Sequence, residues 1–366
     1  MILARPRRAS AGAAAALGLA LSGLAAAVPG HSARAVVADP ATAFVDRLPV
    51  YVPAERVSGT VVLWGHGSFK HDFMGPVVRR WTSELQRTQP GIRMDFRMYG
   101  TASAISALFT GAGNLALLGE EISPSAAAAF RRAKGYPPAR IDVATGSLDT
   151  NFFDYAHMIF VREDNPIAQL TLAQLDAIFG AEHRRSRANI RSWGELGLSG
   201  EWAGKPIQPH GWKTDEDFAL FFREAVLENS HRWNEKIREY VHAVRADSTQ
   251  YDHGLQILEA LARDRYGIAI SNVRYANPHV KQLALASSPG GPFVTASNAT
   301  LISQEYPLVR IVPAYIDKPP GQPVDPAVRE FLRYVLSRQG QRALIEETGY
   351  LPLGARAIEA QLEKLR

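Results

Sequence analysis

Strand-like and helix-like segments alternate along most of this chain of 366 residues. The stretch GTVVLWG at 59–65 is short, apolar and bounded by glycines, which is typical of a buried strand. From Phe73 the apolar residues recur at helical spacing, through Val77 and Trp81 to Leu85. Alternation of this kind predicts an α/β fold, in which helices cover a parallel or mixed sheet.

The same alternation continues towards the C-terminus. Thr101 or Ser103 is expected to cap the second helix. Further strands are expected at 92–100, 114–119, 155–164, 205–211, 266–271 and 308–317. Further helices are expected at 101–111, 123–135, 170–180, 215–227 and 253–264, with one long helical segment at 327–349.

Residues 1–35 have the features of a secretory signal peptide. A basic start between Arg5 and Arg8 precedes an apolar stretch, and Ala33-Arg34-Ala35 matches the A-x-A pattern of a cleavage site. The stretch is also just long enough for an uncleaved membrane anchor. The cleavage pattern favours the signal peptide, so we expect a mature start near Val36 and a soluble protein in the periplasm.

Charge and cysteine content exclude several classes of protein. The chain has 41 basic and 36 acidic residues, but its first 35 residues hold four arginines and no acid. The mature part therefore has 37 basic and 36 acidic residues, which gives no support for binding nucleic acid or anionic lipid. Cysteine is absent, which excludes disulfides, a thiol nucleophile and thiolate-bound metals, and suits an oxidising compartment.

The order of the motifs resembles one known family. A glycine–serine loop precedes the first helix, and it is followed in turn by YGTASAISALFTGAGNLALLGEEIS, VREDNPI, LTLAQLDAIFG, SWGELG, GEWAGKPIQPHG, YGIAIS, YPLVRIVPAYI and VREFLRYVLSRQGQRALIEETGYLPL. Over about residues 57–355 this order is similar to that of the phosphate-binding periplasmic proteins of ABC importers, within the type II solute-binding superfamily.

The resemblance implies two α/β lobes joined by crossing strands, with the ligand in a cleft between them. We assign residues 57–150 and 306–366 to lobe one and residues 151–305 to lobe two. Small-molecule sites are often found in such clefts, and closure over a ligand would be a hinge motion.

The loop GHGSFKHD at 65–72 is the first candidate site. It lies between a strand and a helix, where backbone N–H groups and the helix dipole favour an anion. By resemblance, the amides of Ser68 and Phe69 and the Ser68 hydroxyl would donate hydrogen bonds to it. A tight turn at Gly65 and Gly67 with Ser68 as a plain helix cap fits the same pattern.

The resemblance implies two further groups of ligand residues. Thr101, Ala102 and Ser103 stand where the family has a Gly-Ser-Gly-Thr-like helix start, although a plain cap is again the alternative. Glu120 or Glu121 would accept a hydrogen bond from protonated phosphate, and sulfate, which carries no proton at neutral pH, would be rejected. The sequence does not decide between these glutamates, nor between a ligand role and plain solvation.

The third anion-binding segment departs from the family pattern. The family has an arginine and a Ser-Gly-Thr helix start, whereas this chain has HGWKTDEDF at 210–218. Lys213, with Thr214 beside it, would supply positive charge, but an ammonium lacks the planar fork of a guanidinium. The acids at 215–217 could equally complement the dipole of the helix that begins near Phe218.

This departure leaves the ligand open. Arg274 or Arg310 could replace the expected arginine from elsewhere in the chain. The aromatic residues Trp64, Tyr99 and Trp212 would suit a larger organic ligand.

Two other chemistries would use some of the same residues. A hydrolase would use Ser68 with His66 or His71, but the mature chain has no G-x-S-x-G elbow, and triad members rarely adjoin in sequence. A metal site built on His66, His71 and Asp72, with His157 or His210, lacks any known ligand spacing. Phosphate-binding loops of nucleotide enzymes are absent as well.

The sequence therefore predicts a non-catalytic, monomeric binding protein without metal or cofactor. It would capture phosphate or a related small oxyanion and deliver it to a membrane ABC permease. The alternatives are the same fold with an organic ligand or a sensory role, and a cleft hydrolase that uses Ser68.

Overall fold

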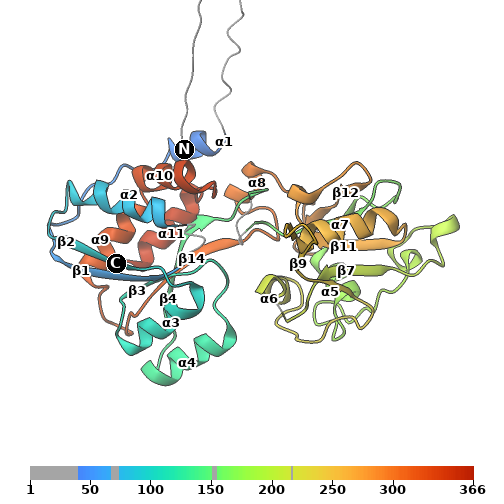
Figure 1. Cartoon of the computed structure of the whole chain (residues 1–366), viewed down its shortest axis with the longest axis horizontal. Coiled ribbons are helices and arrows are strands. Elements are labelled where there is room, and N and C mark those ends of the chain that lie inside the picture. Colours follow the sequence, from blue (N-terminus) through green and yellow to red (C-terminus); the bar gives the residue numbers. More distant parts are fainter. Residues whose placement is uncertain (1–39, 67–73, 151–154, 216) are drawn as a thin grey trace, which may run out of the picture. The chain divides into compact units, whose positions relative to one another are not determined.

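The computed structural model describes residues 40–366 apart from 67–73, 151–154 and 216 (Figure 1). The predicted signal peptide at 1–35 lies outside the described residues. Within the described part, the strands form two five-stranded sheets and two two-stranded sheets. Helices lie between successive strands of both large sheets, which confirms the predicted α/β class.

The first large sheet is mixed, with the strand order β2-β1-β3-β14-β4. Its strands are β1 (Gly59–Gly65), β2 (Ile92–Arg97), β3 (Leu115–Leu117), β4 (Ala139–Thr145) and β14 (Ile311–Ile316). β1 is parallel to β2 and β3, whereas β14 is antiparallel to β3 and β4. A strand from near the C-terminus thus lies between two strands from the first half of the chain.

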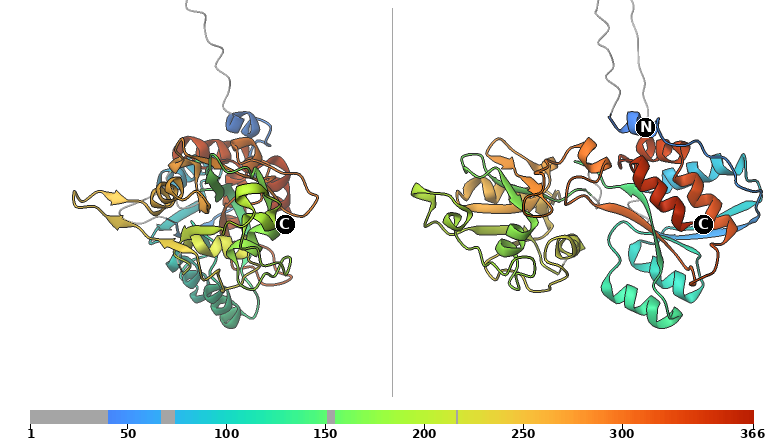
Figure 2. Two further views of the ribbon diagram at one scale, coloured as in Figure 1. Left: turned by 90° about the vertical axis from the view of Figure 1, so that its right-hand side faces the viewer. Right: turned by 180° about the vertical axis from the view of Figure 1, so that it is seen from behind.

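Helices cover both faces of this sheet (Figures 1 and 2). They are α2 (Gly75–Gln86), α3 (Thr101–Thr110), α4 (Pro124–Lys134), α9 (Pro326–Val335), α10 (Arg338–Thr348) and α11 (Ala355–Lys364). Leu115 and Leu117 of β3 pack into a core with α2, α9 and α10. Ala116 and Leu118 pack with α3 and α4 instead. This division follows from the strand geometry, because successive side chains point to opposite faces of a sheet.

The second large sheet has the order β12-β5-β11-β7-β8. Its strands are β5 (Met158–Arg162), β7 (Gln208–Trp212), β8 (Arg238–Tyr240), β11 (Gly267–Ser271) and β12 (Val280–Gln282). It packs with α5 (Leu172–Phe179), α6 (Asp217–Ala225) and α7 (His253–Arg263). β5 and β11 are buried almost throughout, as strands covered on both faces are.

Smaller elements complete the described part. β6 (Gln169–Thr171) pairs with β13 (Ala284–Ala286), and β9 (Ala243–Val244) pairs with β10 (Gln250–Tyr251). The remaining elements are α1 (Pro40–Val45), α8 (Asn298–Ile302) and short 3-10 turns at Trp193–Leu196, Gly200–Trp202 and Val273–Tyr275.

Most predicted elements are confirmed, with differences at particular residues. The expected helical segment at 327–349 is two helices, because Ser337 starts α10 by accepting a hydrogen bond from the Gly340 amide. β4 was not predicted, since Arg140 and Asp142 interrupt its apolar pattern. The lobe boundaries stay a prediction. In the described part of the chain, no helix has the length and apolar character needed to cross a membrane.

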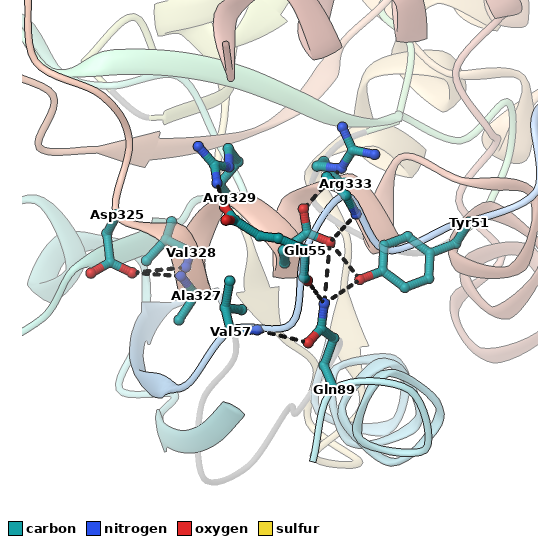
Figure 3. A network of polar contacts seen from close by, with 11 residues as sticks. Tyr51, Glu55, Val57, Gln89, Asp325, Ala327, Val328, Arg329 and Arg333 are labelled. Atoms are coloured by element: carbon teal, nitrogen blue, oxygen red, sulfur yellow. Dashed lines mark hydrogen bonds and ion pairs between the residues drawn. The ribbon is translucent and has the colours of Figure 1, made fainter. Parts of the chain in front are cut away.

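A network around Glu330 of α9 attaches residues 51–57 to the first sheet and its helices (Figure 3). Glu330 is fully buried, and its carboxylate accepts a hydrogen bond from the Tyr51 hydroxyl at 2.7 Å. Arg333 Nε lies 3.1 Å from the same carboxylate. Gln89 donates to the Glu55 carbonyl at 2.6 Å. Burial and this carboxylate raise the pKa of Tyr51, so its hydroxyl stays a donor.

Candidate functional site

Arg310 and Glu121 form a buried ion pair beside the first sheet. β14 and β3 are antiparallel with Ala314 opposite Leu117, so the residue before β14 and the loop after β3 lie at the same end of the sheet. Arg310 donates to Glu121 from Nη2 at 2.7 Å and from Nε at 3.3 Å. The exposed fractions of the two side chains are only 2% and 10%. Two parallel hydrogen bonds are the strongest form of such a pair and fix the plane of the guanidinium.

Aromatic rings from α6 also contact this pair. The Arg310 guanidinium carbon lies 5.8 Å from the centre of the Phe218 ring and 5.5 Å from that of Phe221. The ring faces and the Glu121 carboxylate offset part of the cost of burying a cation. We call Arg310, Glu121, Phe218, Phe221 and the neighbouring His66 the Arg310 cluster.

His66 is a neutral member of the cluster. Its Nε2 lies 2.9 Å from the Tyr350 hydroxyl, and its exposed fraction is 3%. Burial, together with the charge of Arg310, lowers the pKa of His66 to about 3. The ring also packs against Gly119, where an added Cβ would lie 2.3 Å from its Nδ1. Only glycine at residue 119 therefore leaves space for this histidine.

His157 and Trp212 bring unsatisfied polar atoms to the same neighbourhood. The two rings lie 4.4 Å apart, and His157 is 4.9 Å from Phe221. Both His157 nitrogens and the Trp212 Nε1 are buried without a hydrogen-bond partner among the described residues. Burial and the Arg310 charge lower the pKa of His157, so it is neutral at physiological pH. Buried polar atoms without protein partners are typical of a place where a ligand or water binds.

Carboxylates also approach the cluster. The pKa of Glu224 on α6 is raised, mainly by burial and then by the charge of Glu121. Glu120 is partly exposed and adjoins Glu121 in the chain. The Arg310 guanidinium thus lies among carboxylates and neutral aromatic groups.

The start of α3 is tied to the loop that holds Glu121. The Thr101 hydroxyl accepts a hydrogen bond from the Gly119 amide at 3.0 Å. Ser103 donates to the Gly100 carbonyl at 2.8 Å, and Ala102 is exposed. The expected cap at Thr101 or Ser103 is wrong, because Gly100 is the N-cap residue, with a φ of 93° that favours glycine.

The predicted ligand residues Lys213 and Thr214 lie in the third anion-binding segment, at 210–218. Lys213 is paired with Asp215 at 3.0 Å, and its side chain is 46% exposed. The amide and hydroxyl of Thr214 both donate to Glu239, at 3.0 and 2.6 Å. Both residues therefore already contact carboxylates, which an anion would have to displace. Ser68 and Phe69 lie outside the described residues.

Several residues considered for other ligands or chemistries have structural partners. His210 contacts the Tyr240 hydroxyl at 3.0 Å and Asp264 at 3.1 Å. Trp212 is 1% exposed and packs against His157, so it fills space that a larger ligand would need. Arg274 donates to the Asp149 carbonyl at 3.3 Å. Of the two arginines considered as replacements, Arg310 is the one paired with a predicted ligand glutamate.

Sequence reasoning missed the aromatic half of the cluster. Phe218 and Phe221 are spaced three residues apart on α6, which also suits ordinary core packing. His157 lies in an apolar strand context that gave no sign of a cation nearby. These residues are far from Arg310 in the chain, and only the folded structure brings them to it.

Comparison with known proteins agrees with this architecture. The PBP superfamily domain matches residues 71–339. The phosphate-binding protein PstS of Pseudomonas aeruginosa is 31% identical over 348 residues, which cover 94% of this chain and 97% of that protein. Protein SphX of Synechococcus elongatus is 24% identical over 294 residues, covering 80% and 78% of the two chains.

A solved structure shows the same fold. PstS from Borrelia burgdorferi superposes with a TM-score of 0.53 at 13% identity, covering 82% of this chain and 99% of that one. The family resemblance in the order of the motifs is thereby confirmed. The chain belongs to the PBP superfamily and, within it, to the phosphate-binding periplasmic proteins of ABC importers.

Proposed function

We propose that this protein captures phosphate, or a related small oxyanion, and delivers it to a membrane ABC permease. The relative with 31% identity over nearly the whole chain is a phosphate-binding protein, which supports the ligand class. Export through a cleavable signal peptide, a periplasmic location and a monomeric state belong to the same proposal. They rest on the sequence features of residues 1–35 and on the family.

The observation that carries the proposal is the buried guanidinium of Arg310. The family's third segment supplies an arginine, whereas this chain has Trp212 and Lys213 there. Arg310, directly before β14, provides a guanidinium that is always charged and that Glu121 holds in a fixed orientation. We assign to Arg310 the role of the main cation for the anion, with Lys213 as a weaker, exposed contributor.

The two glutamates take different roles in this proposal. Both oxygens of Glu121 already accept hydrogen bonds from Arg310, so its main role is to orient the guanidinium. Glu120 then accepts the proton of hydrogen phosphate and discriminates against sulfate. Thr101, Ala102 and Ser103 at the start of α3, together with Ser68 and Phe69, complete the proposed ligand shell through amides and hydroxyls.

The organic-ligand and hydrolase alternatives gain little from the described residues. Trp212 is buried by its neighbours, so its ring has no exposed face for an organic ligand to contact. The pKa of His66 is about 3, and a group that holds a proton so weakly is a poor general base near neutral pH. A sensory role with the same ligand is compatible with the cluster and differs only in the partner protein.

Calorimetry tests the proposal directly. The purified protein is unfolded, dialysed to remove any bound ligand, refolded, and titrated with phosphate and then with sulfate. Saturable 1:1 binding of phosphate with at least tenfold weaker sulfate binding is expected. A folded protein that binds neither anion would exclude phosphate capture and would favour another ligand.

A further inference from the structure

The hairpin of β9 and β10 brings three potential metal ligands together. Ala243 pairs with Tyr251 in this antiparallel ladder, so continuing the register places His242 opposite Asp252 at the base of the hairpin. His253 follows as the first residue of α7. One ligand atom from each of the three side chains lies within 4.8 Å of the others. His242 Nδ1 is 3.7 Å from an Asp252 carboxylate oxygen.

We propose that His242, Asp252 and His253 form a binding site for a divalent transition-metal cation of the zinc type. Two imidazoles and one carboxylate are the donor set that Zn²⁺ accepts, with a fourth position left for water or another ligand. Mg²⁺ and Ca²⁺ prefer sites built from oxygen alone. None of these three residues belongs to the Arg310 cluster, although His253 contacts Phe218 of that cluster, and the proposed site goes beyond anion capture.

The backbone around the three ligands is fixed by α7. Gln256 Nε2 donates to the Val241 carbonyl at 2.6 Å and to the Tyr251 carbonyl at 2.8 Å. These carbonyls directly precede His242 and Asp252 in the chain. One glutamine side chain therefore holds both strands at the base of the hairpin, which positions the ligands before any metal arrives.

Outer contacts orient the ligands themselves. Oδ1 of Asp252 accepts a hydrogen bond from the Gly254 amide at 2.8 Å, and its other oxygen faces His242. Tyr275 also contacts Asp252. Burial, then the charge of Asp252 and a hydrogen bond with Asp252, raise the pKa of Tyr275. His253 is 1% exposed and packs edge-on against Phe218 at 4.8 Å. Hydrogen-bonded and packed ligands of this kind are usual around metal sites.

Binding one metal ion requires the two imidazole rings to turn, because the lone pairs of stacked rings do not point at a common position. The rings are stacked at 3.9 Å with an interplanar angle of 21°. Ligand atoms around a tetrahedral Zn²⁺ at 2.0–2.2 Å are about 3.4 Å apart. His242 is 37% exposed and can rotate towards the buried His253 ring.

Bound metal would fasten the projecting hairpin to α7 (Figure 2). The hairpin otherwise exposes apolar surface, since Val244 is 76% exposed and Val241 is 42% exposed. A metal that links residue 242 to residues 252 and 253 closes the base of the hairpin. Binding to the folded state alone therefore raises the unfolding temperature.

The test uses the whole protein in phosphate-free buffer. Zn²⁺ affinity is measured by competition with a chromophoric chelator, and Co²⁺ absorption reports the coordination geometry. We expect one Zn²⁺ per chain, no binding of Mg²⁺ at the same concentration, and a higher unfolding temperature with Zn²⁺.

Three variants locate the site. His242→Ala removes the exposed ligand, and Asp252→Asn keeps the N-cap of α7 while it weakens the metal donor. Each should lower the Zn²⁺ affinity at least tenfold and abolish the thermal shift. His279→Ala, at an exposed histidine outside the proposed metal site, should change neither the Zn²⁺ affinity nor the thermal shift. The proposal is overturned if the wild type binds no Zn²⁺, or if His242→Ala binds it as tightly as the wild type does.

Discussion

Arg310 donates two hydrogen bonds to the carboxylate of Glu121 from a position that is almost closed to solvent. The pair forms because β14 is antiparallel to β3, which places the residue before β14 beside the loop after β3. A chain that lacks the family's arginine in its third anion-binding segment thus has a guanidinium fixed from another strand end. This relationship is the basis of the functional proposal and of the predictions below.

Replacing the two adjacent glutamates separately should separate their roles. Glu120→Gln removes the proposed proton acceptor, so sulfate binding should rise relative to phosphate binding by about tenfold, the value of one hydrogen bond of about 1.4 kcal/mol. Glu121→Gln keeps an acceptor for Arg310 and should change this ratio much less. Calorimetric affinities for both anions measure the ratio. The assignment is reversed if Glu121→Gln alone changes it.

The contact between Gly119 and His66 predicts a strong effect of a single methyl group. Gly119→Ala would place a Cβ 2.3 Å from the His66 ring, so the ring or the loop must move. We expect a loss of about 1–3 kcal/mol in the free energy of unfolding and weaker phosphate binding. Gly204→Ala is the matched control, since nothing lies within 4 Å of its added Cβ. Equal unfolding midpoints in urea for both variants would contradict the contact.

Buried histidines predict a pH dependence of stability. The pKa of His66 is about 3 in the folded protein and about 6.5 in an unfolded chain, so between these values the unfolded state binds more protons. Stability is therefore complete above pH 6.5 and falls as the pH is lowered towards 3. Each unit of difference in pKa corresponds to about 1.4 kcal/mol.

Urea unfolding at pH 7.5 and pH 5 measures this loss. His66→Gln retains a partner for the Tyr350 hydroxyl but cannot be protonated, so its loss of stability on acidification should be smaller than that of the wild type. His279→Gln, at an exposed position, should behave like the wild type. Identical losses in all three proteins would show that His66 does not contribute.

The Glu330 network should stabilise the attachment of residues 51–57. Tyr51→Phe removes the hydroxyl that donates to the buried Glu330 carboxylate at 2.7 Å. A hydrogen bond to a buried charge contributes about 1.5–3 kcal/mol, so the unfolding midpoint in urea should fall accordingly. A Tyr51→Phe midpoint equal to that of the wild type would mean that this bond is replaced by water at no cost.

The sequence predicted the fold well because its strands and helices are locally consistent. The stretch at 59–65 is apolar and bounded by glycines, and it is a strand over those same residues. The helix expected at 170–180 is α5, and Gly180 is its C-cap residue. Local chemistry of this kind can be read without knowing what else the segment contacts.

The site depends on long-range pairing, which local patterns do not contain. Nothing near Arg310 in the sequence indicates that β14 lies beside β3, so Arg310 was only one of two possible replacements for the missing arginine. In the same way, His242 and Asp252 are ten residues apart, and only the β9–β10 register places them opposite each other. The predicted ligand residues at Thr101, Lys213 and Thr214 have contacts in the structure, and their part in ligand binding stays a prediction.

The central claim is that Arg310 supplies the charge that binds phosphate. Its most direct test is the phosphate affinity, by calorimetry, of the double variant Arg310→Gln and Glu121→Gln, which leaves no buried charge unpaired. Circular dichroism and the unfolding temperature establish that the variant is folded. We expect saturable binding by the wild type and at least a tenfold loss of affinity in the variant, since a charged hydrogen bond contributes about 1.5–3 kcal/mol. Equal phosphate affinities of the two folded proteins would contradict it.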